Sequence, residues 1–267
     1  MRYLLSVLVL GSVAIASDSV DDIYTPAPEF TGIAAGGGPV WDGPYATLFD
    51  NGPYANSTGT GYGGADESRM TSSESTYGAG CQYVNSNRCA DDFTIPAGQT
   101  WTITGITLFG YQTNSGTNPT INACYLTIYS GDSPNTGTVV YGDYTTNRFS
   151  SAAWTNTYRV SSTEYGTGTA RPIMAIVANV STTLGAGNYW LGWCMNGTGS
   201  SGPWQPPVVN DPPGGVTGNG MQSISGGSFA PLVMGGTGLA YGCPFVISGT
   251  STALERTTWG EIKTVFF

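Results

Sequence analysis

The sequence predicts an all-β protein, an antiparallel β-sandwich with jelly-roll-like connections. Glycine supplies 40 of the 267 residues and charged residues only 9%, whereas Thr, Tyr, Val and Ile provide strand formers. From Trp101 to Tyr111 the side chains alternate with the period of two that is typical of a β-strand. Short apolar segments are separated by turn residues, without helical periodicity or an internal repeat. These features favour a sandwich over a helical protein, a propeller or a solenoid.

The first sixteen residues have the pattern of a secretory signal peptide. Arg2 is followed by an apolar run from Leu4 to Val13 and by the small-x-small site Ala14-Ile15-Ala16. The run is too short to span a bilayer, and no later stretch is longer, so no membrane span is expected. The alternative is a buried N-terminal strand or helix. We therefore expect cleavage after Ala16 and a secreted, extracellular or cell-surface protein.

Residues 17–46 mix acids, prolines and a glycine run, which indicates an extended leader or an edge strand. The β-sandwich domain is expected over residues 47–249, with two long loops at 51–70 and 197–220. Turn clusters of Gly, Asn, Asp, Ser and Pro separate its strand signals. The expected strands are 47–49, 101–111, 121–129, 138–141, 157–160, 172–180, 184–194, 221–224, 229–234 and 245–247.

Residues 250–267 change in character, from a Ser/Thr/Gly linker to a short amphipathic tail. Thr258 and Glu261 have the spacing of a capping box, and Trp259, Ile262 and Phe266 fall on one helical face. One interpretation is a C-terminal helix that docks on its own domain. The other is a sorting or attachment tail.

The charge balance excludes one class of partner. Cleavage of the signal peptide removes Arg2 and changes the formal net charge from −9 to −10. Such an acidic chain repels nucleic acid and has no electrostatic attraction to anionic membranes. No nucleic-acid partner is therefore expected.

Five cysteines are present, and a secreted chain can oxidise them. The absence of histidine and of a CxxC pair argues against a zinc site. Cys81 and Cys89 enclose a short polar loop and are the predicted disulfide. Cys124, Cys194 and Cys243 can form one further bridge in three ways, which leaves one thiol over. That cysteine can pair between subunits or, the alternative we favour, remain a buried and inert thiol.

Without histidine, neither a Ser-His-Asp triad nor a Cys-His pair can be built, which excludes the common hydrolases. A carboxylate-based glycosidase is the remaining enzymatic alternative, but no acidic pair stands out, so the protein is predicted not to be an enzyme. The acids available to such a glycosidase are Asp66, Glu67, Asp91, Asp92, Glu164 and Asp211.

Two acidic pairs are also candidate Ca²⁺ ligands. Asp91 and Asp92 precede a strand, and Asp66 and Glu67 lie in a glycine-rich loop, where carboxylates can join loop carbonyls around a calcium ion. The alternative, which we favour, is that short acidic side chains cap the loop backbone. No cofactor is expected, and calcium is the one candidate.

The chain contains seven Trp and sixteen Tyr residues, most of which are expected in the core. Exposed aromatic rings can stack on sugar rings. Trp204, in the sequence GPWQPP, is the better loop candidate. In the strand around residues 189–194, Trp190 and Trp193 fall on opposite faces, so one of them is expected to be exposed. Tyr62 completes the candidates for glycan stacking.

Three segments of the sequence resemble those of an uncharacterised family of secreted bacterial β-sandwich modules. They are CADDFTIPAGQTWTITGITLFGYQT, NYWLGWCMNG and SSGPWQPP, and the resemblance covers roughly residues 48–247. It implies the sandwich fold but no activity and no catalytic residues. The ending TTWGEIK is also similar to short terminal tails of secreted bacterial proteins, although it continues to Phe266-Phe267.

Together these observations predict a non-catalytic secreted module, structural or adhesive at the cell surface or in a matrix. Its partners would be further copies of itself, joined by strand exchange. The alternative is a carbohydrate-binding β-sandwich that uses exposed tryptophans on an extracellular glycan.

Overall fold

The computed structural model describes residues 46–210 and 214–253, and this part of the chain is an all-β fold. Two short 3₁₀ helices, η1 (Tyr62–Gly64) and η2 (Tyr83–Asn85), accompany the strands. The strands are β1 (Ala46–Asp50), β2 (Asp66–Arg69), β3 (Ala79–Gly80), β4 (Arg88–Gly110), β5 (Ile121–Ser130), β6 (Thr138–Asp143), β7 (Phe149–Val160), β8 (Pro172–Gly197), β9 (Trp204–Gln205), β10 (Met221–Ser223), β11 (Ala230–Pro231) and β12 (Phe245–Ala253).

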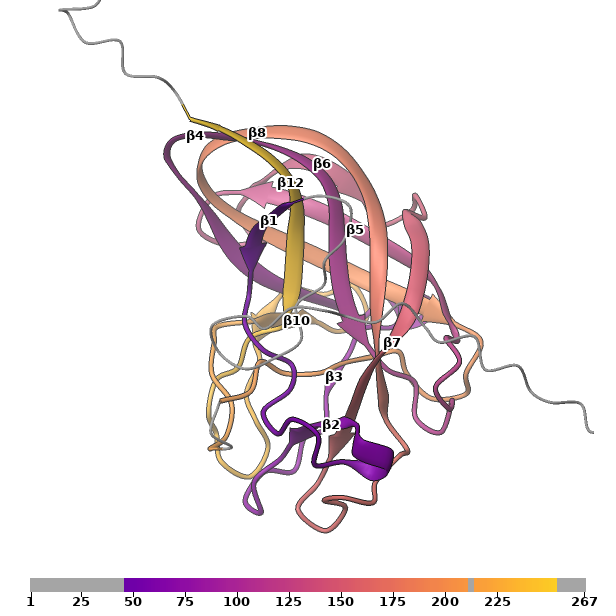
Figure 1. The fold of residues 1–267 in the computed structure, drawn as a ribbon. Helices are drawn as coiled ribbons and strands as arrows, with labels where there is room; N and C mark the ends of the chain where they lie inside the picture. Colours follow the sequence, from indigo (N-terminus) through magenta and orange to yellow (C-terminus); the bar gives the residue numbers. More distant parts are fainter. Residues whose placement is uncertain (1–45, 211–213, 254–267) are drawn as a thin grey trace, which may run out of the picture.

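The two longest strands, β4 and β8, form the antiparallel ribbon on which the fold is built. They pair in two runs, Cys89–Ile95 with Gly187–Trp193 and Thr100–Gly110 with Met174–Gly185. Between the runs the register shifts around Pro96, whose nitrogen has no hydrogen to donate to a sheet. Figure 1 shows both strands arching over at this point. The ribbon therefore contributes one strand pair on each side of the bend.

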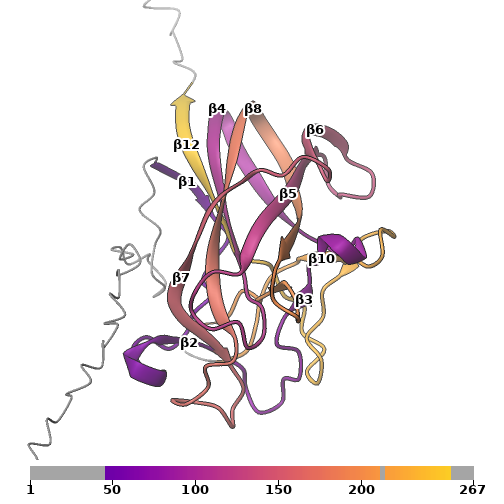
Figure 2. The same cartoon turned by 90° about the vertical axis from the view of Figure 1, so that its right-hand side faces the viewer.

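Other strands extend the two halves of this ribbon separately. The half nearer Cys89 pairs with β10 and β5, which continue to β11 and β6. The half nearer Gly110 pairs with β12 and β7, which continue to β1 and, in parallel, to β2. In the view of Figure 2, β1 and β12 lie on one side and β5 and β6 on the other. A small second sheet joins β3 to β9.

Aromatic rings from the two halves meet in the core. Phe93, on one half of β4, lies 6.1 Å from Phe49 and 6.4 Å from Phe245 on the other half, measured between ring centroids. Trp193 likewise lies 5.8 Å from Phe245. These contacts show that the halves face one another with a hydrophobic layer between them, the arrangement of a sandwich. The pairings do not establish the expected jelly-roll connections.

Most expected strands are present, with changes in extent. The segments expected at 172–180 and 184–194 are one strand, β8, and β4 begins thirteen residues before Trp101. The expected loop at 51–70 contains η1 and β2, and the expected linker begins inside β12. The predicted signal peptide, almost all of the leader and the tail from residue 254 lie outside the described residues.

The predicted Cys81–Cys89 disulfide is wrong in this structure, because all five cysteines are free and buried. The Cys81 thiol donates to the carbonyl of Trp193 (3.3 Å), and the Cys89 thiol faces the carbonyl of Gly80 at 3.7 Å. Burial raises the pKa of both thiols, so they stay protonated. In the described part of the chain, the cysteines therefore serve as small core residues.

No helix within residues 46–210 and 214–253 has the length and apolar character needed to cross a membrane.

Candidate functional site

A cavity of about 410 Å³ opens where four segments from distant parts of the sequence meet. Its volume is within the range of small-molecule sites. One wall is the segment that leads into β3, and another is formed by the residues that follow β4. The residue that precedes β8 and the segment at the start of β9 complete it. The lining residues are Ser75, Thr76, Tyr77, Gly78, Tyr111, Thr113, Arg171, Ser201 and Trp204.

Tyr77 and Trp204 are the aromatic walls of the cavity. Both are half-buried and pack against a small hydrophobic cluster that includes Phe109 and Tyr111. The backbones of Trp204 and Tyr111 exchange two hydrogen bonds of 2.8 and 3.0 Å, and the Trp204 indole N–H donates to the Ser201 hydroxyl (3.2 Å). The Trp204 ring is therefore held in one orientation.

Close backbone approach requires glycine at one lining position. A Cβ atom on Gly78 would lie 2.6 Å from the carbonyl oxygen of Gln205 and 2.9 Å from the Tyr111 hydroxyl. Both distances are shorter than a non-bonded contact between a Cβ atom and an oxygen atom allows. Gly78 thus allows β3 and β9 to pair directly beside the aromatic walls.

Arg171 is the charged residue of the cavity lining. Its guanidinium lies over the Tyr77 ring, 3.5 Å from the centroid, and its Nη1 donates to both oxygens of Glu164 (2.9 and 3.0 Å). Glu164 also accepts bonds from Ser161 and from the Tyr77 hydroxyl (3.3 Å). Partial burial opposes ionisation, but the bonds from Ser161 and Arg171 prevail and lower the pKa of Glu164.

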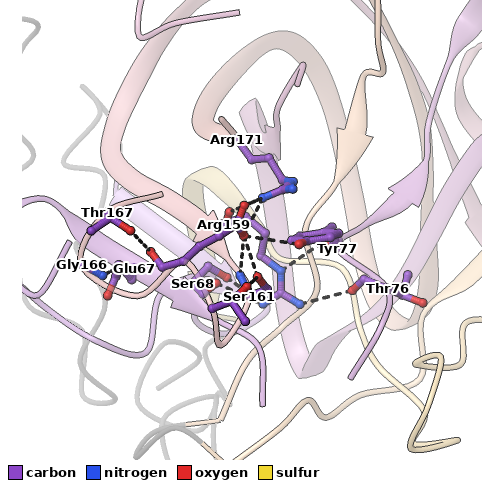
Figure 3. A network of polar contacts seen from close by, with 11 residues as sticks. Glu67, Ser68, Thr76, Tyr77, Arg159, Ser161, Gly166, Thr167 and Arg171 are labelled. Atoms are coloured by element: carbon purple, nitrogen blue, oxygen red, sulfur yellow. Dashed lines mark hydrogen bonds and ion pairs between the residues drawn. The ribbon is translucent and has the colours of Figure 1, made fainter. Parts of the chain in front are cut away.

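Behind this wall, Arg159 is completely buried and fixes the segment that carries Tyr77. Its Nε donates to the Tyr77 carbonyl (3.0 Å) and its Nη2 to the Thr76 carbonyl (3.4 Å). Its Nη1 donates to the carbonyl and the hydroxyl of Ser68 on β2, both at 3.3 Å. Figure 3 shows these contacts converging on the guanidinium. One side chain of β7 thus ties β2 to the cavity wall.

Arg159 forms no ion pair within the described residues. Burial lowers the pKa of its guanidinium to about 10, so it remains charged at neutral pH. A buried charge without an ionic partner is costly unless its donors are bonded, and here three backbone carbonyls and one hydroxyl accept them. All five cationic side chains of the described residues are arginines: Arg69, Arg88, Arg148, Arg159 and Arg171.

Of the four predicted glycan-stacking residues, the structure brings only Trp204 to the cavity. Trp190 and Trp193 are 7% and 0% exposed, so the expectation that one of them is exposed is wrong. Phe229 and Tyr129 cover the face that carries Trp190, and the core covers the face that carries Trp193. Tyr62 is exposed on η1 but does not line the cavity.

The acidic residues proposed as Ca²⁺ ligands bind protein donors instead. Asp66 accepts the backbone N–H of Gly59 (2.7 Å). The fully buried Glu67 pairs with Arg69 (2.7 Å) and accepts the N–H of Gly166 (2.7 Å). These contacts match the backbone-capping alternative. Among the residues described, no group of three or more potential ligands could hold a metal ion.

Asp91 and Asp92 also bind protein donors. The buried Asp91 accepts the backbone N–H of Cys243 (2.6 Å) and of Asp92 (2.8 Å), and Asp92 accepts the side-chain amide of Asn219 (3.1 Å). Burial raises the pKa of Asp91 to about 7, against the opposing effect of its backbone hydrogen bonds. Asp211 lies outside the described residues.

Sequence reasoning missed Tyr77, Tyr111, Arg159 and Arg171. Tyr77 lies between Ser/Thr and glycine residues that indicate only a loop, and the other three lie at or beside the ends of strands. A single arginine in an otherwise apolar strand end, as at Arg159, is the one signal that could have indicated a buried polar network.

No family model matches the chain, and no match was found among the curated proteins or the solved structures. The resemblance to secreted β-sandwich modules therefore stays a prediction.

Replacing Arg159 by methionine should lower the free energy of unfolding by about 2–4 kcal/mol, because three carbonyls would lose a charged donor in a buried site. Chemical denaturation measures the change. Arg88→Met is the control, since Arg88 is partly exposed and stacks on Tyr144; its loss should be below about 1 kcal/mol. Equal losses for the two variants would contradict the role assigned to Arg159.

The raised pKa of Asp91 predicts the pH dependence of stability. The folded protein holds the proton more tightly than the unfolded chain, so the free energy of unfolding should fall as pH rises from about 4 to about 7, by up to about 4 kcal/mol. Asp91→Asn should flatten this slope, while Asp132→Asn, on an exposed turn, should preserve it. Denaturation curves at a series of pH values measure the free energy of unfolding. If its slope against pH is unchanged in Asp91→Asn, Asp91 is not the group responsible.

Proposed function

We propose that this protein is a non-catalytic extracellular module that binds carbohydrate in the cavity between Tyr77 and Trp204. The observation that carries the proposal is the joint position of these two rings in one cavity lined by hydroxyl groups. Sugar rings present apolar C–H faces, which pack on aromatic rings, and hydroxyl edges, which need hydrogen-bond partners. The cavity offers both kinds of contact.

The polar side of the cavity supports the same conclusion. The hydroxyl groups of Ser75, Tyr111 and Thr113 have no hydrogen-bond partner among the described residues, which leaves them available to a ligand. The Ser201 hydroxyl accepts from Trp204 and can still donate its own proton. A ligand with several hydroxyl groups would therefore find matched donors and acceptors close to the stacking rings.

The distribution of acids favours binding over hydrolysis. A glycosidase needs two carboxyl groups on either side of the scissile bond. Among the described residues that line the cavity none is acidic, and the neighbouring Glu164 is engaged by Arg171 and Ser161. A lowered pKa also makes Glu164 unsuited to donate a proton as a general acid.

A second candidate function, assembly of copies through strand exchange, is favoured by the edge strand β6. This strand ends the sheet order beside β5, and its Val139 and Val140 are 54% and 40% exposed. An edge with exposed β-branched apolar residues is a surface on which another strand can pair. The module would then be structural as well as sugar-binding.

The carbohydrate proposal predicts that Trp204→Ala lowers affinity at least tenfold for any glycan that the wild-type protein binds, through the loss of ring stacking. A glycan array identifies the ligand, and calorimetry measures the affinity. Tyr62→Ala, which removes an exposed ring away from the cavity, should bind normally. A wild-type protein that binds no glycan, or a Trp204→Ala variant with full affinity, would refute the site. Thermal unfolding confirms that the variant is folded.

The assembly proposal predicts concentration-dependent self-association, measured by light scattering, that Val139→Lys abolishes because lysine on an edge strand opposes pairing. Val233→Lys, at an exposed position outside the named strands, is the matched control and should still associate. A strictly monomeric wild-type protein at high concentration would contradict assembly and leave sugar binding unaffected.

A further inference from the structure

We infer that the Tyr77–Trp204 cavity selects acidic carbohydrate, and that Arg171 receives the carboxylate of a uronic acid unit. The inference rests on the proposed sugar-binding function and adds the chemical class of the ligand. The evidence is the geometry of the Arg171 guanidinium: Nη1 is bonded to Glu164, whereas Nε and Nη2 donate no hydrogen bond within the described residues.

The fixed edge of Arg171 is held from two directions. Nη1 donates to both oxygens of Glu164, and the guanidinium plane lies on the Tyr77 ring. The Tyr77 hydroxyl donates in turn to Glu164 (3.3 Å), which closes a three-residue cluster. Arg171 is thus ordered before a ligand arrives, so binding loses little side-chain entropy.

The opposite edge of the same group is available. Nε and Nη2 of Arg171 donate no hydrogen bond within the described residues. These two nitrogens carry parallel N–H groups whose spacing matches the two oxygens of a carboxylate. A neutral sugar hydroxyl can use one of them at a time, whereas a carboxylate can use both.

The cations nearest the cavity are Arg171 and Arg159. Glu164 pairs with Arg171, and the buried Glu74 acts electrostatically on Arg159, which forms no ion pair in the described part of the chain. Attraction of an anion therefore rests on the free donors of Arg171 and not on a net positive charge. Figure 3 shows the two guanidinium groups on either side of the Tyr77 segment. The Arg171 side chain is only 15% exposed, so solvent screens its charge less than at an open surface.

The whole chain limits which acidic sugars fit. Its formal net charge of −9 repels a dense polyanion at long range, although salt at physiological strength screens this repulsion beyond roughly 8 Å. A short saccharide, or a chain with isolated uronic acid units, avoids the repulsion and still reaches Arg171. We therefore assign the cavity to one uronate carboxylate, with neighbouring sugar units on the aromatic walls.

Calorimetry with matched ligand pairs tests the inference: uronic acid trisaccharides of galacturonate, glucuronate and mannuronate, each compared with its uncharged methyl ester. At least one free acid should bind the wild-type protein ten or more times as tightly as its ester. Arg171→Gln should remove this preference. Arg171→Lys keeps the charge but not the paired donors, and should retain only part of it.

Arg148→Gln is the matched control, because Arg148 also lies over a tyrosine ring (4.7 Å from Tyr141) and pairs with an acid (3.6 Å from Asp143), but not in the cavity lining. It should keep the full preference. Thermal unfolding shows whether each variant is folded. If Arg171→Gln does not fold, the test is whether Arg171→Lys weakens the preference for the free acid over the ester.

The outcomes separate the inference from the proposed function. Equal binding of acid and ester, both lost in Trp204→Ala, overturns the acidic ligand and leaves sugar binding intact. Binding of no saccharide overturns both. A sulfated trisaccharide that binds tighter than every carboxylate overturns the assignment to a uronate.

Discussion

The backbone pairing of β4 with β8 is the constraint on which the rest of this fold depends. The two strands pair in two runs separated by one bend, so a single ribbon supplies the centre of both sheet halves. Every other strand of the large sheet attaches, directly or through a neighbour, to one half of this ribbon. The core forms because the bend turns the halves toward each other, which brings Phe93 against Phe49 and Phe245. Bulky aromatic rings occupy this interior, and their contacts fix the spacing between the halves.

The sequence was informative about local structure and much less so about which surfaces are covered. Alternation from Trp101 to Tyr111 correctly predicted a strand, because a period of two reflects one residue and its immediate neighbours. The same pattern left open whether Trp190 or Trp193 is exposed, and the structure buries both, since Phe229 from a distant loop covers the outer face. Continuity of β4 through Pro96 was equally hidden, because the Pro-Ala-Gly sequence is typical of a turn and residues 96–99 have no partner on β8.

The candidate site also combines a residue that the sequence indicated with residues that it did not. Trp204 could be identified from its proline-flanked loop, but its partners Tyr77 and Arg171 come from segments far away in the chain. What brings them together is a buried polar network: Arg159 binds the carbonyls of Thr76 and Tyr77, and Arg171 stacks on the Tyr77 ring. A loop of small polar residues has little hydrophobic burial to hold it, so charged donors to its backbone carbonyls hold it instead.

Within the described residues every cationic side chain is an arginine, which would have a chemical consequence for the proposed sugar site. A lysine amine beside a reducing sugar can attack the open-chain aldehyde and form an imine, the first step of glycation. A guanidinium stays protonated at neutral pH and is far less nucleophilic, and no lysine occurs in the described residues. If the cavity binds a reducing saccharide as proposed, its cation Arg171 would therefore not be modified by imine formation.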